Sequence, residues 1–112
     1  MENLVQRQFH CIADATNYHS SHVIPEHRYT LWCKAFDVES LDALFDMTPA
    51  EKAVPLFDAA ITRFNSHPED LRPLLDASDP GGLRGNRNAL VGIRTFLADH
   101  GGTISGTFTE TA

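Results

Sequence analysis

The chain has 112 residues, of which 42% are apolar and 21% are charged. This length suits one domain, and the composition is typical of a globular protein rather than a disordered one. No apolar run approaches the roughly 20 residues that a membrane span needs. Nine basic and fifteen acidic residues give a net charge of −6, which disfavours nucleic acid or an anionic membrane as a direct partner. We therefore expect a single domain over residues 1–112.

The N-terminal heptapeptide MENLVQR has neither the basic nor the apolar region of a secretory signal. The two cysteines, Cys11 and Cys33, allow one disulfide at most, whereas small secreted domains carry several. We therefore expect a cytoplasmic protein in which both thiols are reduced and buried.

Residues 4–15 fit two patterns. Val5, Phe9 and Ile12 have helical spacing, and we favour a helix on that basis. The alternation of Phe9, Cys11 and Ala13 also fits a strand, so the strand remains open as the alternative.

The next two segments differ in composition. Residues 17–27 are polar and rich in histidine, which indicates a loop. Residues 28–36, RYTLWCKAF, follow Pro25 and are rich in aromatic and β-prone side chains, so we expect a strand there.

The middle of the chain predicts two helices. Asp37 is a candidate cap for a short one that buries Val38, Leu41, Leu44 and Phe45. Residues 48–51, TPAE, have a capping-box pattern with proline at the first helical position. Behind them apolar residues recur every three or four positions up to Phe64, with Pro55 inside the stretch, where we expect a kink or a late start.

The last third of the chain predicts two more helices and a strand. Residues 66–69, SHPE, repeat the capping pattern before three leucines. A helix over about 88–100 ends at Gly101-Gly102, which supplies a left-handed stop. Residues 103–111 alternate strictly, with a row of threonine and serine hydroxyls on one face, and predict a terminal strand. As a sheet edge, that strand would offer backbone groups to another chain.

These elements predict an α+β fold, with about four helices packed on a small antiparallel sheet that includes the C-terminal strand. Ten acids and three bases fall within residues 37–79, so an acidic helical middle precedes a short basic segment.

Histidines gather in the first third of the chain, at His10, His19, His22 and His27. Together with Cys11 and Cys33 they have the chemistry of zinc ligands, but no Cys-x-x-Cys pair exists and only His19 and His22 have a workable separation. We expect no metal and no other cofactor. The same residues allow a Cys–His–acid arrangement on paper, yet no catalytic motif supports one.

The stretch 79–88, DPGGLRGNRN, is rich in glycine and leads into the last helix. Backbone amides at a helix start, together with Arg84 and Arg87, form a candidate site for a phosphate or carboxylate. The stretch lacks the Gly-Lys-Ser/Thr of a Walker loop. The alternative is a plain connection in which Asn86 or Asn88 caps the helix.

Three aromatic residues are candidates for protein contact: Tyr29, Trp32 and, in the C-terminal strand, Phe108. Aromatic side chains are enriched at the energetic centres of interfaces. Trp32 is equally well explained as a centre of the core.

We expect a small acidic regulatory protein, not an enzyme, which acts by protein–protein binding as an inhibitor, anti-activator or adaptor. Its partner would be another protein, one with a basic surface if the acidic block steers association, and the chain itself is expected to form a homodimer. The alternative is an anionic-ligand-binding protein or small enzyme that uses Arg84, Arg87 and a histidine from residues 19–27.

Overall fold

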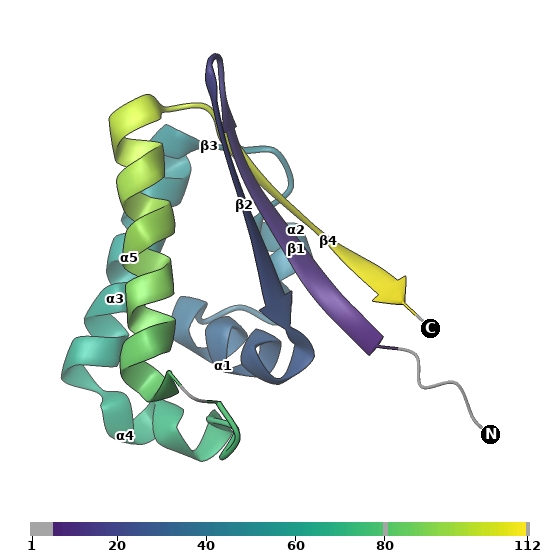
Figure 1. The fold of residues 1–112 in the computed structure, drawn as a ribbon. Helices are drawn as coiled ribbons and strands as arrows, with labels where there is room; N and C mark the ends of the chain where they lie inside the picture. Colours follow the sequence, from purple (N-terminus) through teal and green to yellow (C-terminus); the bar gives the residue numbers. More distant parts are fainter. Residues whose placement is uncertain (1–5, 80, 112) are drawn as a thin grey trace.

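The computed structural model describes residues 6–79 and 81–111, with side chains for residues 9–79 and 81–107. The elements follow one another as a hairpin, a run of helices interrupted by a very short strand, and a final strand (Figure 1). Their bounds are β1 Gln6–Ala15, β2 Tyr18–Pro25, α1 Glu26–Phe36, α2 Leu41–Leu44, β3 Thr48–Pro49, α3 Ala50–Ser66, α4 Pro68–Leu71, a 3₁₀ turn Arg72–Leu74, α5 Gly82–His100 and β4 Thr103–Thr111.

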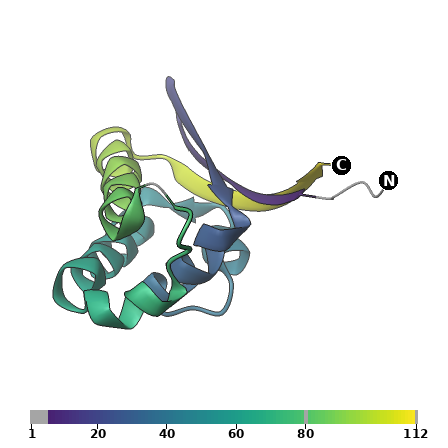
Figure 2. The same cartoon turned by 60° about the horizontal axis from the view of Figure 1, so that its bottom comes forward.

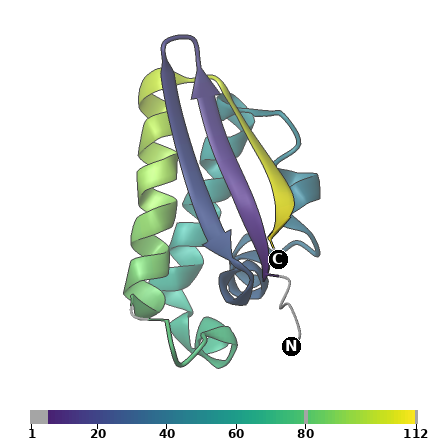
Figure 3. The same ribbon diagram turned by 45° about the vertical axis from the view of Figure 1, so that its right-hand side comes forward.

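The strands form one antiparallel sheet in the order β2-β1-β4-β3. The helices of the described segments all pack on one face of this sheet and leave its other face without a helix (Figure 2). Figure 3 shows β2, β1 and β4 side by side over the helical layer. The α+β class is confirmed, and so is the place of the C-terminal strand within the sheet.

The core lies between the helices and the inner face of the sheet. Phe9, Cys11 and Ala13 of β1 are each 0% exposed, and Ile24 and Ile104 lie opposite them on the two neighbouring strands. Because successive side chains of a strand point to opposite faces, this alternation sends every second residue of β1 into the core.

The expectation of a helix over residues 4–15 is wrong where the structure describes this segment, and the alternative, a strand, is confirmed. Most of the residues expected to form a polar loop, 17–27, are also a strand, β2, which returns along β1 after the two-residue turn at Thr16-Asn17, and the last two of them begin α1. Pairing on both sides of β1 satisfies its backbone groups, and a helix formed by the same residues would bury no such continuous face.

The strand expected over residues 28–36 is wrong, because these residues belong to α1. Leu31 and Ala35 are both buried, as are Trp32 and Phe36, and each pair is separated by one helical turn. Glu26 in the first turn and Lys34 in the last complement the helix dipole. In this segment the burial of one helical face therefore outweighs the β propensity of the residues.

Asp37 does not cap the short helix α2 but ends α1, in the left-handed conformation with φ of 58°. Ser40 caps α2 instead, since its side chain accepts a hydrogen bond from the Ala43 amide at 3.4 Å. The helix expected after the TPAE pattern is confirmed as α3, although the Thr48 hydroxyl donates to the Leu44 carbonyl at 2.6 Å and caps nothing.

The last helix is confirmed, but it begins six residues before the expected start at Asn88, at Gly82. Most of the expected glycine-rich loop is therefore the first turns of α5. The helix ends as expected at Gly101 and Gly102, whose φ angles are 69° and 85°. None of the helices in the described segments is long and apolar enough to cross a membrane.

Candidate functional site

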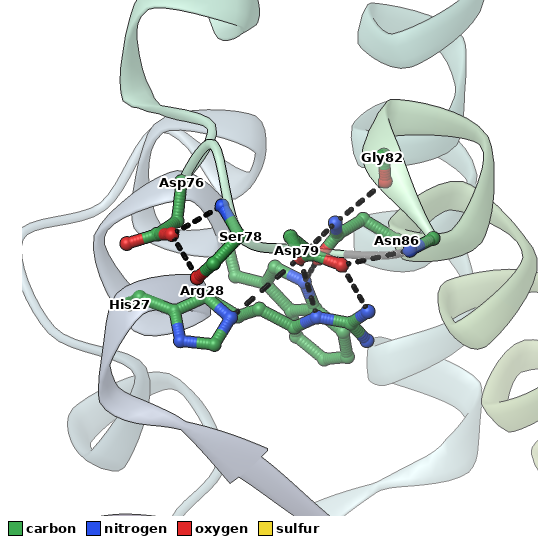
Figure 4. A network of polar contacts seen from close by, with 9 residues as sticks. His27, Arg28, Asp76, Ser78, Asp79, Gly82 and Asn86 are labelled. Carbon is green, nitrogen blue, oxygen red and sulfur yellow. Dashed lines mark hydrogen bonds and ion pairs between the residues drawn. The ribbon is translucent and has the colours of Figure 1, made fainter.

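The entry to α5 is held by a buried polar network around Asp79 (Figure 4). The Arg28 guanidinium donates Nε to Oδ2 of Asp79 at 2.8 Å and Nη2 to Oδ1 at 2.7 Å. The Asp79 side chain is only 1% exposed and also accepts from the Gly81 amide at 3.1 Å. Such a two-point pairing fixes both the position and the orientation of the carboxylate.

Asn86 connects this carboxylate to the core. Its Nδ2 donates to Asp79 Oδ2 at 3.1 Å and to the Gly82 carbonyl at 2.8 Å, while its Oδ1 accepts from Nε1 of Trp32 at 2.8 Å (Figure 4). Asn86 is fully buried, and all its polar atoms are used. It therefore lies inside α5 and does not cap it, contrary to the alternative considered from the sequence.

The charge of Asp79 is stabilised by its partners. The hydrogen bonds from Arg28, with further ones from Asn86 and the Gly81 amide, hold the pKa of this carboxyl well below its usual range despite burial. His27 Nε2 lies 3.7 Å from Asp79 Oδ2 at the exposed end of the network. Because its groups are satisfied by one another, the network orders the chain rather than offering a reactive group.

The residues expected to contact a protein partner lie in different surroundings. Trp32 is 1% exposed and is part of the core, as the second explanation of it required. The Tyr29 hydroxyl, half-buried with its ring, donates to Asp42 at 2.7 Å and accepts from the Leu41 amide at 3.0 Å. The side chain of Phe108 is outside the described part, and its backbone lies opposite Phe9.

Arg84 and Arg87 line one cavity of about 210 Å³, and they share it with Arg72. Its other lining residues are Phe64, Asn65, Pro68 and Leu83. The first turns of α5 present the two arginines, and the 3₁₀ turn after α4 presents the third. No histidine of residues 19–27 lines this cavity, so the described structure does not combine the arginines with a histidine there.

Sequence reasoning missed Arg72 as a lining residue of this cavity and Asp79 as the centre of the buried polar network. Arg72 is twelve positions from Arg84, and the chain between them carries no periodic pattern that predicts their approach. Asp79 had one usable signal, since it is the last acid before a helix start.

Among the described residues, no three of the histidines and cysteines considered from the sequence lie close enough to share a metal ion, although Cys11 and His22 are opposite each other in the register of β1 and β2. His19 lies 3.9 Å from Asp14 on the open side of the hairpin, and the Ser20 hydroxyl lies 2.8 Å from His22 Nε2. Burial raises the pKa of the Cys11 thiol to about 12, so this group is not a nucleophile near neutral pH. Cys33 is buried too, and the same cause raises its pKa.

Among the described side chains, the group that has metal-ligand chemistry and proximity is His67, Glu69 and Asp70. All three are exposed and belong to or adjoin α4, and they include none of the ligands considered from the sequence. Exposed acidic groups of this kind are common on solvated helix ends.

The outer edge of β2 is a second feature of interest, because in the described part of the chain β2 has a strand on one side only. The Gly106 amide donates away from β1, to the Phe45 carbonyl at 2.8 Å. Its partner in the register, Cys11, therefore turns its backbone groups toward β2 and His22. By alternation, the backbone groups of Ser21 and Val23 point outward from the sheet.

This edge lacks the usual protection. From Tyr18 to Pro25 it contains no Asp, Glu, Lys or Arg, and its only proline is the last residue. Val23 is 49% exposed on the open face. Natural edge strands are commonly guarded by charges, proline or very short length, and β2 has eight residues.

The chain matches no family model, no curated protein and no solved structure.

Proposed function

We propose that this protein is a non-catalytic regulatory module that acts by protein–protein binding, and that an extended segment of its target adds to the sheet beside β2. One observation carries the proposal, namely the eight-residue outer edge of β2, which has no strand partner within the described residues and contains no Asp, Glu, Lys or Arg. Backbone pairing at such an edge supplies affinity, and alternate side chains supply specificity.

The surroundings of the edge support a strand of moderately apolar character. Ile12 is half-buried and Val23 is exposed, and both lie on the helix-free face of the sheet, next to hydroxyl side chains. Opposite this face, the acidic helical layer favours approach by a target with a basic surface. The homodimer expected from the sequence corresponds to the case in which a second copy supplies the added strand.

Ser21 allows a sharp test. In Ser21→Pro the lost amide is one that points outward, so the β1–β2 ladder is retained, while an added strand loses a hydrogen bond and meets the proline ring. Ser21→Ala is the matched control, since it keeps the amide. Protein captured from lysate under mild conditions would be weighed by native mass spectrometry, and thermal unfolding would confirm that both variants fold.

We expect wild type and Ser21→Ala to carry the same protein partner and Ser21→Pro to lose it. A partner that is a second copy of the chain would appear as a dimer that Ser21→Pro converts to a monomer. If folded Ser21→Pro retains the same partner, the partner does not bind at the β2 edge. If all three samples contain only the bare monomer, the proposal of protein binding itself is contradicted.

A further inference from the structure

The described arginines fall into two sets. Three are paired with carboxylates, at 2.7 Å for Arg28, 2.9 Å for Arg94 and 3.8 Å for Arg63. The three that have no carboxylate partner within the described residues are Arg72, Arg84 and Arg87, and these are the three that line the 210 Å³ cavity. In a chain with a net charge of −6, three guanidinium groups around one hollow without an acid are a distinct local environment.

The cavity also has an apolar wall. Phe64 from α3, Pro68 from α4 and Leu83 from α5 line it, and Asn65 contributes an amide. No Asp or Glu is among its lining residues. Low-polarity walls strengthen the attraction between an anion and the arginines, because they replace water that would screen it.

Arg87 has no acidic partner among the described residues, and one of its hydrogen-bond donors is unused. Its Nη1 donates to Asn65 Oδ1 at 3.1 Å and its Nη2 to Asn88 Oδ1 at 3.3 Å, so both partners are neutral amides. Its Nε is buried and has no hydrogen-bond partner in the described structure. A buried donor without a partner is unfavourable, and the positive charge of this guanidinium has no acid beside it, so a bound anion would supply the missing counter-charge.

We propose that this cavity binds a phosphate group, held by Arg72, Arg84 and Arg87. A dianion with several oxygens matches three guanidinium groups better than a single carboxylate does. Leu83 and Arg84 lie in the first turn of α5, where the helix dipole adds attraction for an anion. The buried Asp79 network holds that turn in place through the Gly82 carbonyl and Gly81 amide.

The phosphate group has two possible sources, the free ion and an organic monoester. The apolar wall distinguishes them, because it offers contact to the organic part of an ester and nothing to free phosphate. Calorimetric titration at low salt with phenyl phosphate, inorganic phosphate and benzoate separates the cases. Tighter binding of phenyl phosphate assigns the monoester, equal or tighter binding of inorganic phosphate assigns the free ion, and preference for benzoate overturns the proposal.

Charge-removing variants test the assignment to these residues. Arg84→Gln and Arg72→Gln each remove an exposed guanidinium, and we expect each to weaken phosphate binding about tenfold or more. Arg94→Gln is the matched control, since it removes the same charge from α5 but leaves the cavity intact, and we expect less than about twofold change.

Either absence of binding by the wild type or equal weakening by Arg94→Gln overturns the site, since equal weakening indicates attraction by overall charge alone. Thermal unfolding of each variant establishes that the binding changes occur in folded protein. The residues of this cavity are different from those of the β2 edge, so failure of one proposal leaves the other untouched.

Discussion

At the scale of single residues, burial decides the chemistry of Asp79. In the sequence it is one acid among ten in the stretch 37–79. In the structure its side chain is 1% exposed and receives two hydrogen bonds from Arg28. A surface pair such as Asp58 and Arg94 has similar donors but remains solvated, so its contribution to stability is small.

Because Asp79 is buried and paired, whereas Asp58 is solvated, we expect the stability contributed by Asp79 to depend on pH. Asp79→Asn should lower the free energy of unfolding by about 3 kcal/mol near neutral pH, because it leaves Arg28 without its charge partner. The pKa of Asp79 is lowered by folding, so its stabilisation is complete above the ordinary carboxyl pKa and is lost as the pH falls through the folded value. The difference in the free energy of unfolding between wild type and Asp79→Asn should therefore become smaller below about pH 4.

Urea unfolding at several pH values measures this gap. Asp58→Asn is the control and should cost less than about 1 kcal/mol at neutral pH. A gap that stays constant from neutral pH into the acid range would show that the Asp79 charge contributes nothing to folding.

At the scale of elements, the long-range pairing of β1 and β4 explains both a success and a failure of sequence reasoning. The hydroxyl alternation of residues 103–111 predicted β4, and its bounds are confirmed. β1 carries a weaker local pattern, and it is a strand because β2 and β4 pair with it on both sides. Gly106 makes this pairing possible, since a Cβ there would lie 2.2 Å from Cζ of Phe9.

Two glycine-to-alanine changes should therefore have opposite effects. Gly106→Ala should destabilise the protein by about 2 kcal/mol, because the Phe9 ring must move within a packed core. Gly92→Ala, in the exposed interior of α5, where the added carbon would meet nothing within 4 Å beyond the adjacent backbone of its own helix, should stabilise it by about 0.5–1 kcal/mol.

Chemical denaturation of both variants against wild type measures these shifts. A stabilising Gly106→Ala would mean that the Phe9 ring does not pack against β4. A destabilising Gly92→Ala would mean that the helix surface at this position is covered by another chain.

At the scale of the whole molecule, the order of the strands makes the C-terminal segment part of the core. β4 lies between β1 and β3 and carries Ile104, which is 0% exposed. The segment expected from the sequence to be a candidate edge is therefore internal at its start, where Thr48 pairs with it, and the longer free edge belongs to β2.

Truncation after Gly102 should consequently abolish folding rather than merely change an oligomer. It removes the central pairing partner of β1 and exposes Phe9 and Ala13 to water. Thermal scans by circular dichroism should show no cooperative transition for the truncated chain. A cooperative transition would indicate that the hairpin and helices form a core without β4.

The features that could be predicted from the sequence are those that depend on interactions between nearby residues. These are the α+β class, the amphipathic stripe of α3, the stop at Gly101-Gly102 and the alternation of β4. In each of these features the residues that form the pattern are neighbours along the chain, so periodicity and turn chemistry are enough to predict the feature.

The remaining features depend on contacts between residues that lie far apart in the chain, so they could be seen only once the chain was folded. Residues 6–15, expected to be helical, form a strand because strands pair with them on both sides, and residues 28–36, expected to be a strand, belong to a helix because they bury one helical face. Arg28 and Asp79 are 51 positions apart, and Trp32 and Asn86 are 54 apart. Tertiary packing brings such groups together, and it likewise brings Arg72 close to Arg84 and Arg87. No local sequence pattern predicts these contacts.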